Sequence, residues 1–160
     1  MLNPVEKFVV GAYWGSRAEM PEGCAQRLNQ LLDGLKSLDP VFAEWFAKGP
    51  SAGTSRTRIL SPADIFALAV RGMNRRDLDA SPIPSLGVRI GVWNGGREGT
   101  TAVGISTGCG SLDEPGGVPA LNSLLISLPN QGPDADRILD VKALEKMLEV
   151  VVRAYDLTGR

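Results

Sequence analysis

The sequence of 160 residues contains no histidine. Histidine is the usual general base of hydrolases, the commonest zinc ligand and the side chain that titrates near neutral pH. Its absence excludes catalysis, zinc binding and pH switching of the kinds that depend on an imidazole. The charge is also balanced, since 17 basic and 18 acidic residues leave a net charge of −1. We therefore expect no direct binding of nucleic acid, which needs a strong basic excess.

Cysteine is scarce, and the two residues, Cys24 and Cys109, form no Cys-x-x-Cys pair. Two cysteines are too few for a disulfide framework, so we predict reduced structural thiols. Cys109 stands between two glycines, which would make its thiol accessible, but neither a histidine nor a helix N-terminus is evident beside it to activate it. We interpret it as a buried or idle thiol and expect no metal site and no cofactor.

Long apolar runs are absent as well. No segment approaches the roughly 20 apolar residues that cross a membrane. The first residues lack the basic start, the apolar stretch and the small-residue cleavage site of an export signal. We therefore predict a cytoplasmic protein with no membrane partner. The length and a hydrophobic content of 43% are those of a single domain over 1–160.

The pattern of apolar residues predicts four helices. The first begins at Pro21 and the second, a short one, is capped by Asp39. The third is capped by Ser61 and runs to about Asn74, and the last is capped by Asp140. Their apolar residues recur at the spacing of one buried helical face. We place the following residues inward: Cys24, Leu28, Leu31, Leu32, Leu35 and Leu38; Val41, Phe42, Trp45 and Phe46; Ile65, Phe66, Ala69, Val70 and Met73; Val141, Leu144, Leu148, Val151, Val152 and Tyr155.

Four strands are predicted, at Lys7–Trp14, Leu86–Trp93, Thr101–Thr107 and Asn122–Leu128. The last three follow one another with turns and no helix between them, which favours an antiparallel meander. The order β-α-α-α-β-β-β-α predicts an α+β fold with an antiparallel sheet of about four strands and helices packed on one face. The other face would carry Arg89 and Trp93 among glycines and Ser106, a surface where a partner can dock.

Glycine-rich segments do not form a nucleotide site in this sequence. Residues 49–58 hold glycines and hydroxyl groups but no lysine of the phosphate-loop pattern, so we expect an exposed mobile loop there. The glycines at 108–117 lie between two predicted strands and precede no helix. Acidic residues gather in the loops 108–119 and 130–137, at opposite ends of a strand, where a common metal cage is not expected: Asp113, Glu114, Asp134 and Asp136.

Three segments in order resemble the opening of the Imm52 immunity proteins of bacterial polymorphic toxin systems. They are Tyr13–Arg17 (YWGSR), Glu22–Leu28 (EGCAQRL) and Leu38–Gly49 (LDPVFAEWFAKG). The strand Val88–Gly95 (VRIGVWNG) is similar to a strand of that family which ends in WNG. The resemblance covers the first 49 residues closely and the sheet more loosely.

The resemblance implies a cytoplasmic antidote, not an enzyme, that binds and neutralises a cognate toxin. In this family the toxin is typically a restriction-endonuclease-like nuclease delivered by a type VI secretion system. Tight binding relies on a few aromatic or arginine anchors, for which we name Tyr13, Trp14, Arg89 and Trp93. The acidic residues of the two loops, Asp113, Glu114, Asp134 and Asp136, would steer association.

Two alternatives remain open at this level. The first is a small-ligand-binding protein or enzyme with a pocket between the sheet and its helices, where Arg17 or Arg89 would hold an acidic molecule. The second is a component of a larger assembly, with self-association through an exposed sheet edge. A homodimer is compatible with either the antidote or the assembly.

Overall fold

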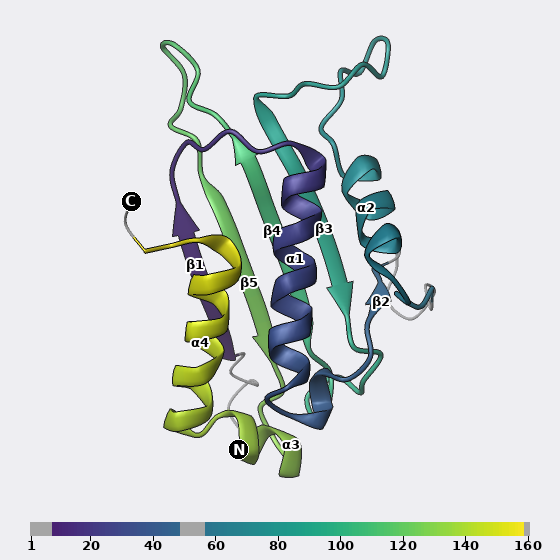
Figure 1. Cartoon of the computed structure of the whole chain (residues 1–160), viewed down its shortest axis with the longest axis vertical. Helices are drawn as coiled ribbons and strands as arrows, with labels where there is room; N and C mark the ends of the chain where they lie inside the picture. The colour runs from purple at the N-terminus through teal and green to yellow at the C-terminus, as the bar shows by residue number, and fades with distance from the viewer. Residues whose placement is uncertain (1–7, 49–56, 159–160) are drawn as a thin grey trace, which may run out of the picture.

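The structure is a computed structural model that describes residues 8–48 and 57–158. One antiparallel sheet has the strand order β1-β5-β4-β3-β2, and helices pack against it (Figure 1). The strands are β1 (Phe8–Trp14), β2 (Phe46–Ala47), β3 (Leu86–Trp93), β4 (Gly104–Ser111) and β5 (Asn122–Leu128). The helices are α1 (Pro21–Lys36), α2 (Pro62–Arg71), α3 (Pro133–Ile138) and α4 (Val141–Tyr155), with a 3-10 turn η1 (Pro40–Phe42). The predicted α+β class is confirmed, with five strands instead of about four.

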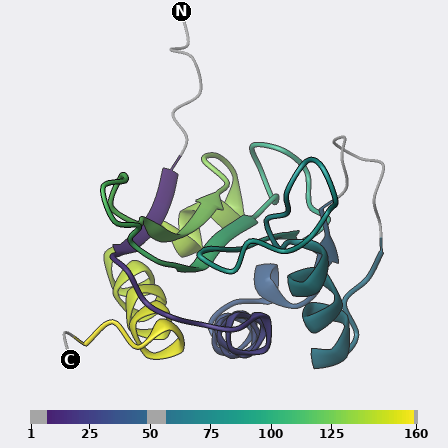
Figure 2. The same ribbon diagram turned by 90° about the horizontal axis from the view of Figure 1, so that it is seen from above.

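Helices α1, α2 and α4 all cover the same face of the sheet (Figure 2). The reason is the alternation along the strands, because successive side chains of a strand point to opposite faces. In the three meander strands one set of alternate residues is apolar and buried, and these residues form the core with the leucines of α1. The core members from these three strands are Val88, Ile90, Val92, Ile105, Cys109, Leu124, Ile126 and Leu128.

Helix α1 agrees with its prediction. It begins at Pro21, and its predicted inward residues from Cys24 to Leu35 are buried. Helix α2 begins with the expected Ser61–Asp64 capping box, and the carboxylate of Asp140 accepts a hydrogen bond from Lys142 N at the start of α4. None of the helices in the described ranges is long and apolar enough to cross a membrane.

The helix predicted after Asp39 is wrong. Asp39 caps only the short turn η1, and the chain then extends into β2, where Phe46 pairs with Trp93 of β3. The aromatic residues Phe42 and Trp45 are nevertheless buried, and Trp45 Nε1 donates to the carbonyl of Phe42 at 2.9 Å. Apolar residues at helical spacing therefore reach the core here through a turn. Part of the predicted mobile loop and Lys7 of the first predicted strand lie outside the described residues.

The strand predicted over Thr101–Thr107 is β4 in the structure, which begins three residues later and ends four residues later, and so includes Cys109. Cys109 is 1% exposed, as expected for a buried thiol, but the prediction of reduced cysteines is wrong. Cys24 of α1 and Cys109 of β4 form a disulfide, with their Cα atoms 6.1 Å apart. The sequence did not show this pairing because 85 positions separate the two residues. The disulfide fastens the central helix to the middle of the sheet.

Two helices bury a narrower part of their predicted inward face than expected. In α2, Ile65 and Ala69 are buried, whereas Phe66 and Val70 are exposed. In α4, the buried residues are Met147, Val151, Ala154 and Tyr155. Val141 and Leu148 of α4, predicted to point inward, are 68% and 45% exposed. The apolar stripe of α4 is therefore wider than the strip that the sheet and α1 cover.

An ion pair joins the η1 turn, which follows α1, to α3. Arg137 Nε and Nη2 donate to the two carboxylate oxygens of Asp39 at 3.0 and 3.1 Å, and Nη2 also donates to Asp134 Oδ1 at 2.5 Å. The hydrogen bond from Arg137 holds the pKa of Asp39 below its usual range, although partial burial opposes that shift. Asp39 also accepts from Val41 N at 2.9 Å, so one carboxylate organises η1 and anchors α3.

Reduction of the Cys24–Cys109 disulfide is expected to lower the free energy of unfolding by about 2–4 kcal/mol, because the disulfide restricts the unfolded chain. Thermal unfolding with and without reductant measures this difference. A Cys24→Ala/Cys109→Ala variant is the control, since reductant should leave its Tm unchanged. Equal Tm values for the unaltered protein in both conditions would contradict the assignment.

The Asp39–Arg137 pair makes stability depend on pH. The pKa of Asp39 is lowered in the folded protein, so the pair stabilises it above the unfolded pKa of about 4, and this contribution is lost as the pH falls through the lower folded pKa. We expect Arg137→Ala to lower Tm at neutral pH and to have little effect at strongly acidic pH. Arg153→Ala, an exposed arginine of α4, is the control. A Tm loss for Arg137→Ala that is the same at both pH values would refute this explanation.

Candidate partner-binding face

The sheet has a second face, opposite the helices, which we call the open face. The strand register places Val9, Gly11 and Tyr13 of β1 on it, beside Ser123, Leu125 and Ser127 of β5. The inner strands contribute mainly glycine and serine. These residues are Gly104, Ser106 and Gly108 of β4 and Arg89, Gly91 and Trp93 of β3. The open face is therefore flat, with a few large side chains above an accessible backbone.

One group of large side chains lies at the β2–β3 end of the open face. The rings of Phe46 and Trp93 are 6.4 Å apart and tilted by 53°, in the tilted arrangement that aromatic pairs favour. Phe46 also lies over Gly95, where a Cβ would come within 2.8 Å of the phenyl ring and where φ is +72°. Glycine at position 95 thus allows the aromatic pair to sit against the turn that follows β3.

Two cations lie across the glycines of this face. The aliphatic part of Arg89 passes Gly108, and that of Lys48 passes Gly91, with Lys48 Nζ close to Gly104. Both residues are exposed, and no strand residue that the described register places on this face is acidic. The open face is consequently positive although the whole chain has a net charge of −1. Such a local field favours an acidic surface on a partner.

Tyr13 and Trp14 are neighbours in sequence but lie on opposite faces. Tyr13 is 62% exposed on the open face. Trp14 lies on the helix side, where its ring is 5.3 Å from that of Tyr155, and the guanidinium carbon of Arg17 lies 5.2 Å from the centre of the Trp14 ring. The strand alternation therefore separates the two aromatic candidates, with Tyr13 available to a partner and Trp14 part of the packing between β1 and α4.

A charged cluster holds the segment after β1 against the helices. Glu19 pairs with Arg27 of α1 through a short hydrogen bond and lies 3.5 Å from Arg17 Nη2. Arg27 Nη1 also donates to the carbonyl of Ala154 at 3.3 Å. Burial beside this cluster raises the pKa of the Tyr155 phenol. These contacts give a structural role to the arginines of the Tyr13–Arg17 and Glu22–Leu28 segments, Arg17 and Arg27.

Asn94 organises the turn after β3. Its Nδ2 donates to the carbonyls of Val41 and Thr101 at 3.0 and 2.7 Å, while its Oδ1 accepts from Gly96 N and Val103 N at 3.1 and 2.8 Å. The side chain thereby links the β3–β4 connection to η1. Asn94 and Gly95 fix the turn after β3 and thereby position Trp93 at one end of the open face.

The acidic candidates separate into two groups at opposite ends of the molecule. Asp113 and Glu114 are exposed in the β4–β5 loop, beyond one end of the sheet. Asp113 Oδ1 accepts from Ala120 N at 2.6 Å, and Glu114 Oε1 accepts from Ser85 Oγ at 2.9 Å. These carboxylates close the loop, and they also place negative charge at the rim of the sheet.

Asp134 and Asp136 lie in α3, past the other end of β5 (Figure 1). Asp134 pairs with Arg137, whereas Asp136 is exposed. The structure does not bring these two residues together with Asp113 and Glu114, as the antiparallel geometry predicted. In the described residues one set of potential metal ligands does converge, Glu19 with Cys24 and Cys109, but the disulfide and the arginine pairs already engage these groups.

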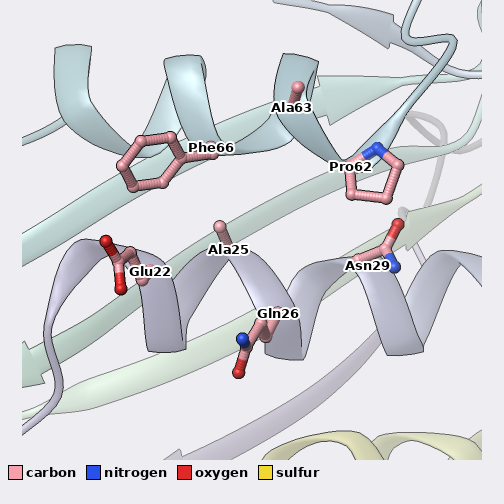
Figure 3. A pocket seen from close by; sticks show the side chains of 7 residues that line it. All are labelled: Glu22, Ala25, Gln26, Asn29, Pro62, Ala63 and Phe66. Carbon is pink, nitrogen blue, oxygen red and sulfur yellow. The ribbon is translucent and has the colours of Figure 1, made fainter.

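A cavity of about 290 Å³ lies between α1 and α2 (Figure 3). Its lining is apolar with a few polar side chains: Glu22, Ala25, Gln26, Asn29, Pro62, Ala63 and Phe66. The ligand-binding alternative places Arg17 or Arg89 in a pocket between sheet and helices, but this cavity lies within the helix layer and neither arginine lines it. Its lining therefore offers no cation for an acidic small molecule.

Of the predicted anchors, Tyr13, Arg89 and Trp93 share the open face, and Trp14 does not. Phe46 and Lys48 join them, and sequence reasoning missed both because it placed Phe46 in a helix. The alternation of Phe46, Ala47 and Lys48 was the available signal, since a strand over these residues points Phe46 and Lys48 to one side.

Comparison with known proteins identifies the family of the chain. No curated protein matches the chain. The model of the family described as Immunity protein 52, Imm52, matches residues 6–158, which is nearly the whole chain. The match extends the resemblance of the first 49 residues across the sheet and the last helix. The chain therefore belongs to the Imm52 family of immunity proteins.

Proposed function

We propose that this chain neutralises a cognate toxin by binding it stoichiometrically through the open face of the sheet, without catalysing a reaction. Membership of an immunity-protein family implies a toxin partner. The observation that supports the open face is its combination of exposed Tyr13, Arg89 and Lys48 with the half-buried Trp93, on a sheet surface that no described helix covers.

The composition of the open face suits a protein partner. Tyrosine, tryptophan and arginine are the residues that most often dominate binding energy in protein interfaces. The glycines and serines between them keep the surface flat and allow a partner to approach the backbone closely. Tyr13 and the Phe46–Trp93 pair lie on opposite edges of the sheet, so a partner that contacts both would cover its whole width.

The charges suggest how the partner approaches. Arg89 and Lys48 favour an acidic region of the toxin at the centre of the contact. Asp113 and Glu114, at the rim, favour basic regions around it, and a nuclease carries such regions because it binds phosphate. A partner surface that is acidic at its centre and basic around it complements both the central cations and the acidic rim. Asp134 and Asp136 lie at the opposite end of the sheet and would steer a larger toxin in the same way.

We further propose that the toxin is a nuclease-type effector of a type VI secretion system and that neutralisation occurs in the cytoplasm. This proposal rests on the resemblance and on the charge pattern. The Cys24–Cys109 disulfide is uncommon in a reducing compartment, so in the cytoplasm the pair would consist of two buried thiols. Both cysteines are buried on the helix side of the sheet, so neither sulfur lies on the open face.

Rescue of cells from the toxin tests the proposal. Cells that express the cognate toxin should grow only when this chain is co-expressed, and the purified proteins should elute together as a stoichiometric complex. We expect Arg89→Glu to weaken binding by about 2 kcal/mol or more, the size typical of an interface anchor. Arg71→Glu makes the same charge change on α2 and should leave the affinity unchanged. Equal effects of the two substitutions would exclude the open face.

The neighbours Tyr13 and Trp14 provide a second, internal comparison. Tyr13→Ala should weaken toxin binding and leave Tm nearly unchanged, because the side chain is exposed. Trp14→Ala should lower the free energy of unfolding by about 3 kcal/mol, because it removes a large packed ring. Calorimetry of binding and of unfolding separates the two effects. Undiminished affinity in Tyr13→Ala would argue against this end of the face.

A further inference from the structure

The outer edge of β1 is unpaired in the described structure. β1 is the last strand of the sheet, and its seven residues, FVVGAYW, include no charge and no proline. Proteins usually protect such edges with charges, bulges or very short strands. The opposite edge is protected in this way, since β2 has two residues and is bridged by Arg58. β1 has none of these features and offers free backbone groups to another strand.

The flank of α4 beside this edge is also apolar and exposed. Val150 of α4 lies against Gly34 of α1, where an added Cβ would come within 2.5 Å of it. At about 100° per residue, Leu148 and Val141 lie on the opposite flank of α4, away from α1. Both are exposed, and Val152 on the same flank is half-buried. These are the residues that the apolar periodicity of α4 had predicted to be inward.

The strand and the helix run side by side and match in length. Both run in the same direction, and Trp14 at the end of β1 packs on Tyr155 at the end of α4 (Figure 1). Seven strand residues span about 23 Å and fifteen helical residues about 22 Å. Gly11 and Leu148 are the middle residues of the two elements, so they lie at about the same level. The edge and the flank form one largely apolar strip, with the exposed Glu145 of α4 at its outer margin.

We propose that this strip binds a second copy of the chain, with β1 pairing antiparallel to β1 of the other copy about a twofold axis at Gly11. In this register Phe8 lies opposite Trp14, Val9 opposite Tyr13 and Val10 opposite Ala12. Aromatic and β-branched pairs of this kind stabilise antiparallel strands, and no charged side chains face one another. The same axis brings Leu148 of α4 towards Leu148 of the other copy and covers both exposed flanks.

The resulting dimer would contain one sheet that continues through both chains, with all helices on one side. It would leave the open faces of the two copies uncovered and adjacent. The dimer is inferred from the edge of β1 and the flank of α4 and does not depend on toxin binding. It is tested with the protein alone, so its failure can be distinguished from failure of the proposed function.

The molecular mass in solution, measured by light scattering over a wide concentration range, tests the dimer. We expect twice the mass of one chain, and we expect Val9→Lys and Leu148→Lys each to raise the dimer Kd at least tenfold. Leu78→Lys, at a fully exposed position elsewhere, should have no effect. A monomer at every concentration, or a dimer insensitive to both edge variants, would overturn the proposal. A monomer in which Leu148→Lys, away from the open face, loses toxin binding would overturn the dimer and assign the strip to the toxin.

Cysteine cross-linking gives a second test that does not depend on disruption. Directly opposed residues of antiparallel strands have Cα atoms about 4.5–5.5 Å apart, within the range of a disulfide. Gly11→Cys should therefore form a covalent dimer on mild oxidation, and its Cβ would meet only the end of the Leu125 side chain closely. Ser127→Cys, exposed on β5, should stay uncross-linked. Equal cross-linking of both variants would refute the register.

Discussion

The alternation of the strands is the constraint on which the rest of the structure depends. Every second side chain of β3, β4 and β5 points to the helices, and these side chains are mostly apolar, with Thr107 and Asn122 as buried polar exceptions. The intervening positions are mostly glycine and serine, which contribute little to a second core. Burial of apolar surface is therefore available on one face only, and a two-layer structure with one open face results. The candidate binding face is thus a consequence of how the core is built.

The segments shared with the Imm52 family mainly support this arrangement. Arg17, Glu19 and Arg27 fix the connection between β1 and α1. Asn94 fixes the turn that carries Trp93. Each cluster lies at one end of the sheet and sets the position of an aromatic residue of the open face, Tyr13 or Trp93. The motifs therefore hold the edges of the open face in place, while the side chains that we assign to toxin binding project from it.

Sequence reasoning identified the elements whose signal is local. The leucine spacing of α1, the alternation of β3 and the Asp140 cap are set by neighbours within a few residues, and the structure confirms them. The predictions failed where contacts between residues distant in the sequence determine the structure. Asp39 and Pro40 start a helix in either case, and only the pairing of Phe46 with Trp93 ends it after one turn. The Cys24–Cys109 disulfide depends on a fold that no spacing reveals.

The candidate site shows the same limit. The position of Arg89 and Trp93 on one face followed from the period of two in β3, but Trp14 was grouped with Tyr13 because its packing depends on Tyr155, more than a hundred residues away. The predicted inward faces of α2 and α4 were too wide because periodicity detects an apolar stripe without showing how much of it the core covers. In α4 the uncovered part lies beside the free edge of β1, where a second chain would bury it.

Side-chain footprinting of the complex with the cognate toxin tests most directly whether the toxin binds the open face. We expect Tyr13 and Trp93, which project from the open face, to be protected from modification when toxin is bound. Phe66 on α2 and Leu78 beyond it, both exposed on other surfaces, should remain as reactive as in the free protein. Protection of Phe66 with unchanged reactivity of Tyr13 and Trp93 would place the toxin on the helix layer and contradict the central claim.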